Sequence, residues 1–298
     1  HKGSTLDSFK RIHFQSVKAR KHFDLEESEQ PYFQAEILVK NTIPLEFIKN
    51  IENVGISIPS KPKALQSKNA YTAQITRNTP TAFIFLVDQS VSMKRMTTLN
   101  GEKITLAEVV ARIVNKKIKD LIYRCIKTDE IRHYYDIAVI GYGHEAYSGW
   151  NGALLDKDFV SPEELKNNPY KKIIVNEAVK TRKGVQIKEV EQIQWLEARC
   201  DGNWTHLHKA FEKAKELLDT WMTKHHDKDC YPPTIINITD GAFNHATKEQ
   251  LIQQANELKA LFTNDGNLLL WNIHVTPENE SKILFPTHKE ELNGNAYA

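Results

Sequence analysis

The chain has 298 residues, a length that corresponds to one large domain or to one domain with a sizeable extension. Hydrophobic residues make up 40% and charged residues 26%, and the formal net charge is +2, so the charge balance gives no reason to expect nucleic acid or an anionic membrane surface as a partner. No run of about 18 apolar residues occurs, and the sequence therefore predicts no insertion into a membrane.

Residues 1–79 differ in pattern from the rest and are predicted to form an N-terminal extension. Short strand-like and helix-like segments are followed by a polar stretch with turn-forming residues at 60–69, which is typical of a connector. The sequence gives this extension no function. We expect it to pack on the main domain, with a separate partner surface as the alternative.

From residue 80 onward, strand-like and helix-like segments alternate. Apolar, β-rich runs predict strands over 81–87, 134–143, 233–239 and 267–275, and apolar residues at three- and four-residue spacings predict amphipathic helices over 103–125, 205–224 and 246–262. The apolar stripe of the first helix includes Val110, Ile113, Val114 and Ile118. This alternation predicts an α/β fold over 80–298: a Rossmann-like, doubly wound, mostly parallel sheet with helices on both faces. The sequence predicts no further helix after the strand at 267–275, although such a sheet usually has one.

A long insertion is expected at about 145–200, and it contains a predicted β-hairpin whose turn lies near Lys183 and Gly184. A compact α/β connection does not need such a length, and long loops are often functional. The insertion leads directly into the polar segment at 202–205. We therefore expect it to take part in selecting a partner, so that its deletion abolishes partner choice and leaves metal binding intact.

Three polar segments follow predicted strands or open a predicted helix. They are Asp88-Gln89-Ser90-Val91-Ser92 after the first strand, Gly202-Asn203-Trp204-Thr205 before the second helix, and Thr239-Asp240-Gly241 after the third strand. Ligands of such sheets bind at the carboxyl ends of the strands. The predicted fold therefore brings all three segments to one edge of the sheet.

These side chains suit a hard divalent cation. Mg²⁺ prefers about six oxygen ligands in near-octahedral geometry and gives up its waters reluctantly. The hydroxyls of Ser90, Ser92 and Thr205 are candidates for direct ligands, and the carboxylates of Asp88 and Asp240 are candidates for accepting hydrogen bonds from coordinated water. An ion with neutral ligands stays electrophilic, and we expect it to take one anionic oxygen from an Asp or Glu of a partner protein. Mn²⁺ and Ca²⁺ are alternatives to Mg²⁺.

The D-x-S-x-S segment, the later threonine and the T-D-G segment resemble the metal-ion-dependent adhesion site of von Willebrand factor A (vWA) domains over roughly residues 80–298. The resemblance implies a Rossmann-like domain. In it, Ser90, Ser92 and Thr205 coordinate the metal directly, and Asp88 and Asp240 accept hydrogen bonds from the waters that the metal coordinates. It also implies a scaffold or adaptor for protein–protein interaction rather than an enzyme, similar to intracellular prokaryotic members of the family. Val91 stands where the family commonly has glycine, and a β-branched residue resists positive φ, so the loop is expected to differ in shape or to bind metal less tightly.

Several alternatives stay open at this stage. Asp, Ser and Thr after strands are common turn and N-cap residues, and Thr205 is expected to cap its helix as well. A Mg²⁺-dependent phosphoryl-transfer or hydrolytic enzyme on the same fold is the second functional hypothesis, and a structural domain with a vestigial site is the third. Zinc binding would involve some of His206, His208, His225, His226 and Cys230. The residues Tyr142, Tyr147, Trp150 and Trp204 are candidates either for the rim of a binding face or for simple packing, and His144-Glu145 for the same crevice or a plain loop.

The three cysteines are odd in number and widely spaced, which argues against a disulfide framework. Reduced thiols are typical of a cytoplasmic protein, and a bacterial cytoplasm is the setting that the resemblance favours.

Overall fold

The structure is a computed structural model that describes residues 70–276, except 182–183 and 242. Residues 1–69 lie outside the described residues, and the role predicted for the N-terminal extension therefore stays a prediction. The last residues of that extension contact the main domain, because the amide of Tyr71 donates to the carbonyl oxygen of Asp265 over 2.7 Å. Within the described ranges, no helix is long and apolar enough to cross a membrane.

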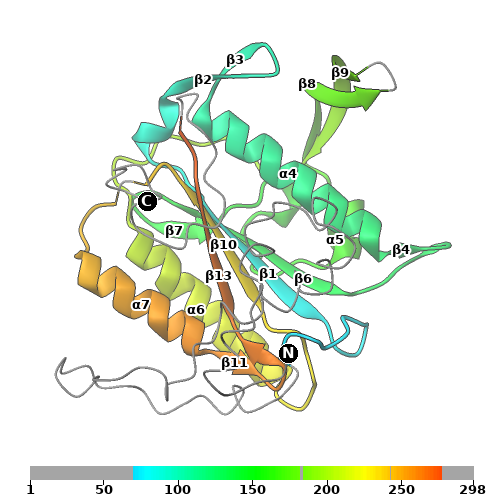
Figure 1. The fold of residues 1–298 in the computed structure, drawn as a ribbon, viewed down its shortest axis with the longest axis vertical. Helices are drawn as coiled ribbons and strands as arrows, with labels where there is room; N and C mark the ends of the chain where they lie inside the picture. The colour runs from blue at the N-terminus through cyan, green and yellow to red at the C-terminus, as the bar shows by residue number, and fades with distance from the viewer. Residues whose placement is uncertain (1–69, 182–183, 242, 277–298) are drawn as a thin grey trace, which may run out of the picture. The chain divides into compact units, whose positions relative to one another are not determined.

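A five-stranded sheet forms the centre of the fold (Figure 1). Its strand order is β13 (Leu269–His274), β10 (Thr234–Thr239), β1 (Thr81–Asp88), β6 (Tyr135–Tyr142) and β7 (Ala146–Ser148). The first four strands are parallel to their neighbours, and β7 at the edge pairs antiparallel with β6. The predicted mostly parallel α/β sheet is therefore confirmed, and each of its four predicted strands is present.

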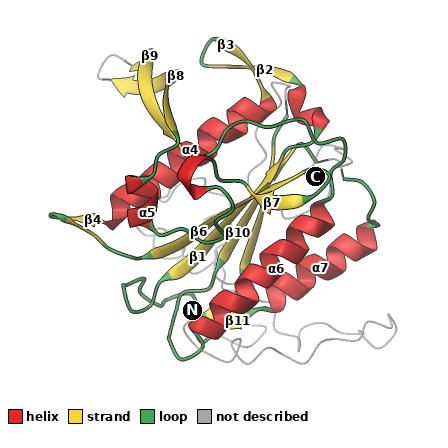
Figure 2. Ribbon diagram, turned by 180° about the vertical axis from the view of Figure 1, so that it is seen from behind, coloured by secondary structure: helices red, strands yellow, loops and turns green. Residues whose placement is uncertain are grey.

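Helices cover both faces of this sheet (Figure 2). On one side lie α4 (Leu106–Cys125) and α5 (Pro162–Asn167), and on the other lie α6 (Leu207–Lys224) and α7 (Lys248–Ala260). Alternate residues of β1 divide between the two cores, as strand geometry requires. Phe85 packs in the core on the α4 side, whereas Ile84 and Leu86 pack in the core on the α6 side.

The first helix begins later than predicted. Residues 103–105 belong to a hairpin of β2 (Met96–Leu99) and β3 (Glu102–Thr105), which the sequence reading missed. The helix α4 then starts at Leu106 with a capping box, in which the Thr105 side chain accepts from the amide of Glu108 and the Glu108 carboxylate accepts from the amide of Thr105. The remaining short pairs are β4 (Ile126–Lys127) with β5 (Glu130–Ile131) and β11 (Phe262–Thr263) with β12 (Gly266–Asn267).

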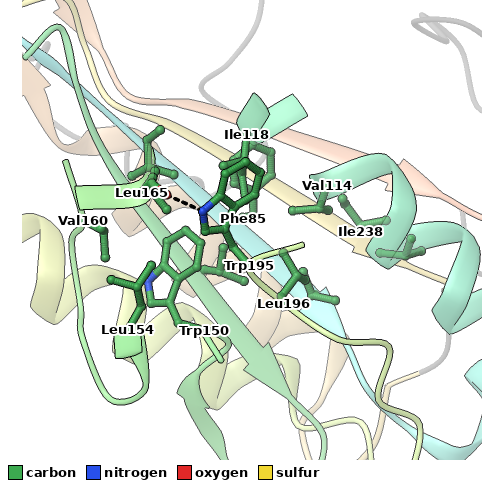
Figure 3. Packing of buried hydrophobic residues seen from close by; sticks show 14 of the residues in the cluster. Phe85, Val114, Ile118, Trp150, Leu154, Val160, Leu165, Trp195, Leu196 and Ile238 are labelled. Atoms are coloured by element: carbon green, nitrogen blue, oxygen red, sulfur yellow. Dashed lines mark hydrogen bonds between the residues drawn. The ribbon is translucent and has the colours of Figure 1, made fainter. Parts of the chain in front are cut away.

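The insertion contains the predicted hairpin, formed by β8 (Lys171–Thr181) and β9 (Gly184–Gln194). The insertion also contains two short helices that were not predicted, the 3-10 helix η6 (Gly152–Leu154) and α5, and both precede the hairpin. Trp150 and Trp195 of the insertion are almost fully buried in the core on the α4 side, and the Trp195 indole donates to the carbonyl oxygen of Leu165 over 2.6 Å (Figure 3). Much of the insertion is therefore part of the hydrophobic core.

Two expectations about single residues are wrong, and one open alternative is decided. Ile113 is 42% exposed instead of facing the core. For Trp150 and Tyr142, the choice between the rim of a binding face and simple packing is decided in favour of packing, because both are fully buried. The N-cap position of α6 is held by His206 rather than Thr205, and the His206 side chain makes no capping hydrogen bond.

The chain order within the sheet defines where a ligand site is expected. From β1 the chain moves through α4 to β6 and β7 on one side, and it then returns through α6 to β10 on the other side of β1. The strand order therefore reverses between β1 and β10. In open α/β sheets, ligands bind outside the carboxyl ends of the strands at such a switch point. Here the carboxyl end of β1 leads into the loop of Ser90, and the carboxyl end of β10 leads into Asp240.

Candidate metal centre

Asp88 is the last residue of β1, and its side chain is completely buried. The amide of Ser90 donates to Oδ1 over 2.9 Å, and the hydroxyl of Thr239, the last residue of β10, donates to Oδ2 over 2.6 Å. The hydroxyl oxygens of Ser90 and Ser92 lie 2.9 Å apart. The carboxylate of Asp88 thus joins the first polar segment to the end of the neighbouring strand.

Asp240 follows β10 directly, and its side chain is only 1% exposed. Its Oδ2 accepts a hydrogen bond from Nη2 of Arg95 over 2.8 Å. Its Oδ1 is buried and has no hydrogen-bond partner within the part of the chain that the structure describes. A buried carboxylate oxygen without a partner is unfavourable, and either a free water or a water coordinated to a cation would supply the missing hydrogen bond.

The two carboxylates influence each other. Burial raises the pKa of Asp88 above its ordinary value, hydrogen bonds from Ser90 and Thr239 offset part of this rise, and the nearby charge of Asp240 adds to it. A cation at this place would relieve both the burial cost and the repulsion between the two carboxylates.

Thr205 is buried and is connected to the other site residues through the backbone. The segment that carries it is tied to the first loop by Gly202, whose carbonyl oxygen accepts from the amide of Val91 and whose amide donates to the carbonyl oxygen of Gln89. It is tied to the third loop by Asn244, whose side chain accepts from the amide of Thr205 over 3.1 Å. The three predicted segments therefore lie next to one another.

Gly202 allows two loops to approach closely. A Cβ atom at this position would lie 2.9 Å from Cα of Gly143 and 3.0 Å from the carbonyl oxygen of Gln89. Any side chain here would push the loop of Thr205 away from the loop of Ser90. The sequence alone indicates no role for Gly202, because its close approach to Gly143 depends on the tertiary structure.

The residues present fit a hard divalent cation. Hydroxyl oxygens from two serines, a buried threonine and one unpartnered carboxylate oxygen are the donor types that Mg²⁺ and Mn²⁺ accept. Val91 is not among the described residues with positive φ, which agrees with the preference of a β-branched residue. The Val91 side chain is 48% exposed. A loop that differs in shape from that of the family, or that binds metal less tightly, stays a prediction.

A zinc site built from all the candidate histidines and Cys230 does not form. His206 and His225 flank opposite ends of the 18-residue helix α6, which is about 27 Å long. Among the described residues, no group of three or more His, Cys, Asp or Glu side chains is arranged to hold a metal ion. His206 instead packs near His144, His208 and His245, with ring centroids 4.8–5.4 Å apart.

Arg95, Thr239 and Asn244 also belong to the site and were not predicted as functional. Thr239 belongs to the T-D-G segment, and the sequence offered one signal for its role. Its hydroxyl stands at the end of one predicted strand, and Asp88 directly follows another. Arg95 carried a weaker signal as a basic residue in the metal loop. Its partner Asp240 lies 145 residues away, so the pairing was not readable from sequence.

No protein-family model matches this chain, and no curated protein matches it. Similar solved structures include a von Willebrand factor type A protein from Catenulispora acidiphila (11% identity, TM-score 0.33) and the vWF domain of the type V pili tip protein Mfa5 from Porphyromonas gingivalis (15% identity, TM-score 0.29). Another is the manganese-loaded Plasmodium vivax TRAP protein (14% identity, TM-score 0.33). The matches cover 65%, 59% and 66% of this chain and 33%, 44% and 58% of the respective structures.

This chain thus corresponds to less than two thirds of each of those three chains. At TM-scores of 0.29 to 0.33 the similarity supports no conclusion about function. The α/β architecture rests on the strand order and register of this chain.

Proposed function

We propose that this chain is a metal-dependent protein–protein interaction module of the vWA type. In this proposal Ser90, Ser92 and Thr205 bind Mg²⁺, Asp88 and Asp240 hold its coordinated waters, and the ion takes a carboxylate from an Asp or Glu of a partner protein. The observation that carries the proposal is the buried, unpartnered Oδ1 of Asp240, at the switch point where the Ser90 and Ser92 hydroxyls follow the neighbouring strand.

The surface around the site supports a protein partner. Each of the three loops that carry the proposed ligands also carries one exposed apolar residue: Val91, Trp204 and Phe243 are 48%, 43% and 36% exposed. The Trp204 ring is held edge-on against His245 with centroids 4.5 Å apart. Aromatic side chains are common anchors of protein interfaces.

The alternative is a Mg²⁺-dependent phosphoryl-transfer or hydrolytic enzyme. Such an enzyme needs a nucleophile or base that reaches its substrate. Asp88, the candidate nucleophile, is completely buried, and both of its oxygens already accept hydrogen bonds. This arrangement suits a carboxylate that positions other groups and therefore favours the binding module.

The proposal includes a cytoplasmic, bacterial setting. All three cysteines are free thiols, and both Cys125 and Cys230 are buried. Burial raises the pKa of each of these two thiols to about 11, so they are protonated and unreactive at neutral pH. Unpaired cysteines of this kind are typical of a reducing compartment.

Selection of random peptides on the Mg²⁺-loaded protein tests the binding role. We expect the selected peptides to contain an Asp or Glu and to be released by EDTA, because the metal needs an anionic oxygen. Ser92→Ala should lower their capture, whereas Ser148→Ala, which removes a hydroxyl bound to the Lys157 carbonyl oxygen, should not. Selected peptides without acidic residues, or capture that survives EDTA, would contradict the proposal.

A further inference from the structure

Arg95 lies at the boundary between the buried site and solvent. Its guanidinium donates to Oδ2 of Asp240 over 2.8 Å, and its side chain is 50% exposed, while that of Asp240 is 1% exposed. The neighbouring basic residue Lys94 is also exposed, but it belongs to the 3-10 helix η5 (Val91–Lys94) and has no recorded ion pair with Asp240. Arg95 therefore reaches into the site from its rim.

The two oxygens of Asp240 have different surroundings. Oδ2 is taken by Arg95, and Oδ1 is the buried oxygen without a partner. Within the described ranges, the pair of Arg95 with Asp240 is the single ion pair that either Asp88 or Asp240 forms. Arg95 thus places one permanent positive charge beside the centre and leaves the other oxygen of Asp240 available.

The charge of Arg95 has opposite effects on the two ligands of the proposed site. It repels a divalent cation, because two positive charges then share one carboxylate. The two carboxylates neutralise the divalent ion, and Arg95 leaves the loaded centre with one net positive charge. That charge attracts the carboxylate of a partner, and a bound carboxylate makes the whole site neutral.

We propose that Arg95 is a specificity-determining residue that weakens the binding of the metal and strengthens the binding of an acidic partner group by the loaded centre. This inference rests on the proposed function, because it presupposes a metal held by Asp88 and Asp240. The charge of Arg95 lowers the metal affinity of the protein without a partner. Metal binding is thereby coupled to the binding of an acidic partner group.

Arg95→Gln tests this role, since glutamine keeps a hydrogen-bond donor and removes the charge. Lys94→Gln is the matched control, because it removes the same charge from the adjacent residue without touching Asp240. The metal probe is Mn²⁺, measured by isothermal titration. We expect Arg95→Gln to bind Mn²⁺ about threefold to tenfold more tightly than the wild type, and Lys94→Gln to change the affinity less than twofold or so.

The carboxylate probe is acetate, added to the Mn²⁺-loaded proteins and followed by the relaxation of water protons as it displaces coordinated water. We expect acetate to bind about threefold more weakly to Arg95→Gln than to the wild type. Arg95→Lys keeps the charge and should resemble the wild type in both measurements, which separates the effect of charge from any loss of folding.

The outcomes distinguish the two proposals. If the wild type takes up no Mn²⁺, the proposed function is overturned, and the role of Arg95 with it. If the wild type binds Mn²⁺ and Arg95→Gln binds it no more tightly, or if Lys94→Gln tightens it equally, only the role of Arg95 is overturned. Acetate binding that is unchanged in Arg95→Gln would also contradict that role.

Discussion

Asn115 is a fully buried amide in the middle of α4, and all of its polar atoms have partners. Its Nδ2 donates to the carbonyl oxygens of Ala111 and Leu196, each over 2.9 Å. Its Oδ1 accepts from the amide of Trp195 over 2.7 Å and from the amide of Leu196 over 3.3 Å. This side chain therefore fixes the segment that leads from the hairpin toward Gly202 against the helix.

Replacing Asn115 by leucine keeps the volume and removes all four hydrogen bonds. The amide of Trp195 and the carbonyl oxygen of Leu196 would then be buried without partners, and each such group costs about 1–3 kcal/mol. We expect the free energy of unfolding of Asn115→Leu, measured by urea denaturation, to fall by about 2–4 kcal/mol. The surface control Lys117→Leu should change it by less than about 0.5 kcal/mol. Equal effects of the two substitutions would contradict this account of Asn115.

The same helix shows which residues the sequence allowed us to predict. Periodicity placed Val110, Val114 and Ile118 in the core, and all three are fully buried. It also placed Ile113 there and gave no place to Asn115, because apolar spacing carries no information on a polar group whose partners lie about 80 residues further along the chain. The five proposed metal residues rest on a clearer sequence signal, since Asp88 and Asp240 stand at the ends of predicted strands, and their role stays a prediction.

At the level of elements, Asp136 connects the start of β6 to α6. Its Oδ2 accepts from the indole of Trp221 over 2.8 Å, and its Oδ1 lies 2.7 Å from Nε2 of His133. Burial alone would raise the pKa of Asp136, but hydrogen bonds from His133 and Trp221 outweigh it and lower the pKa. The hydrogen bond to Asp136 in turn raises the pKa of His133.

The pair therefore stabilises the fold in a limited pH window. The lowered pKa of Asp136 contributes stability above its unfolded value of about 4, which is lost as the pH falls through the folded pKa. The raised pKa of His133 contributes stability below its unfolded value of about 6.5, which is lost as the pH rises through the folded pKa. We expect His133→Ala to lower the melting temperature most between about pH 4 and 6.5.

The control for this measurement is His226→Ala, since the His226 ring bonds to the backbone carbonyl oxygen of Thr223 rather than to a carboxylate. Its effect on the melting temperature should be nearly constant over the same range. A His133→Ala effect that is as large at pH 9 as at pH 5.5 would show that the ion pair contributes nothing.

The β8–β9 hairpin projects beside α4 and lies near the β2–β3 hairpin (Figure 1). The Asn100 side chain donates to the carbonyl oxygen of Asn176 over 2.8 Å, and the amide of Asn176 donates to Glu102 over 3.2 Å. Because β2 directly follows the loop of Ser90 and Ser92, these contacts link the insertion to the proposed site. They support the prediction that the hairpin takes part in partner selection, which stays a prediction.

The structure narrows the deletion that can test this role. Removing all of 145–200 would take Trp150 and Trp195 out of the core, so that a loss of metal binding in this deletion would not separate a loss of folding from a loss of the site. Removing only 178–187 and joining Glu177 to its cross-strand partner Lys188 by an Asn-Gly turn leaves the core intact. We expect this variant to bind Mg²⁺ like the wild type and to select different peptides. Selection of the same peptides would exclude the hairpin tip from the interface.

At the level of the whole molecule, the long elements were predictable and the short ones were not. The four parallel strands and three long helices have clear periodic patterns, and their alternation fixed the fold class. The edge strand β7 and the β2–β3 hairpin have only three or four residues per strand, too few for a period to stand out. The order of the strands depends on contacts between distant residues, and the sequence predicted no order.

This order explains why residues from distant parts of the sequence form one site. The reversal between β1 and β10 brings Asp88 and Asp240 together, and the return of the chain through Gly202 places Thr205 in the adjoining loop. Polar residues after strands are ordinary in any α/β protein. A buried carboxylate oxygen without a partner in the described chain, beside two hydroxyls at the switch point, is the feature that distinguishes this edge of the sheet.

Titration of Mg²⁺ into the wild type and Asp88→Ala by calorimetry tests the central claim most directly. Asp158→Ala is the matched control, because it removes an aspartate that pairs with Lys213 at the surface. The account predicts that the wild type and Asp158→Ala take up Mg²⁺ and that Asp88→Ala, confirmed as folded by circular dichroism, does not. Equal uptake by Asp88→Ala, or no uptake by the wild type, would contradict it.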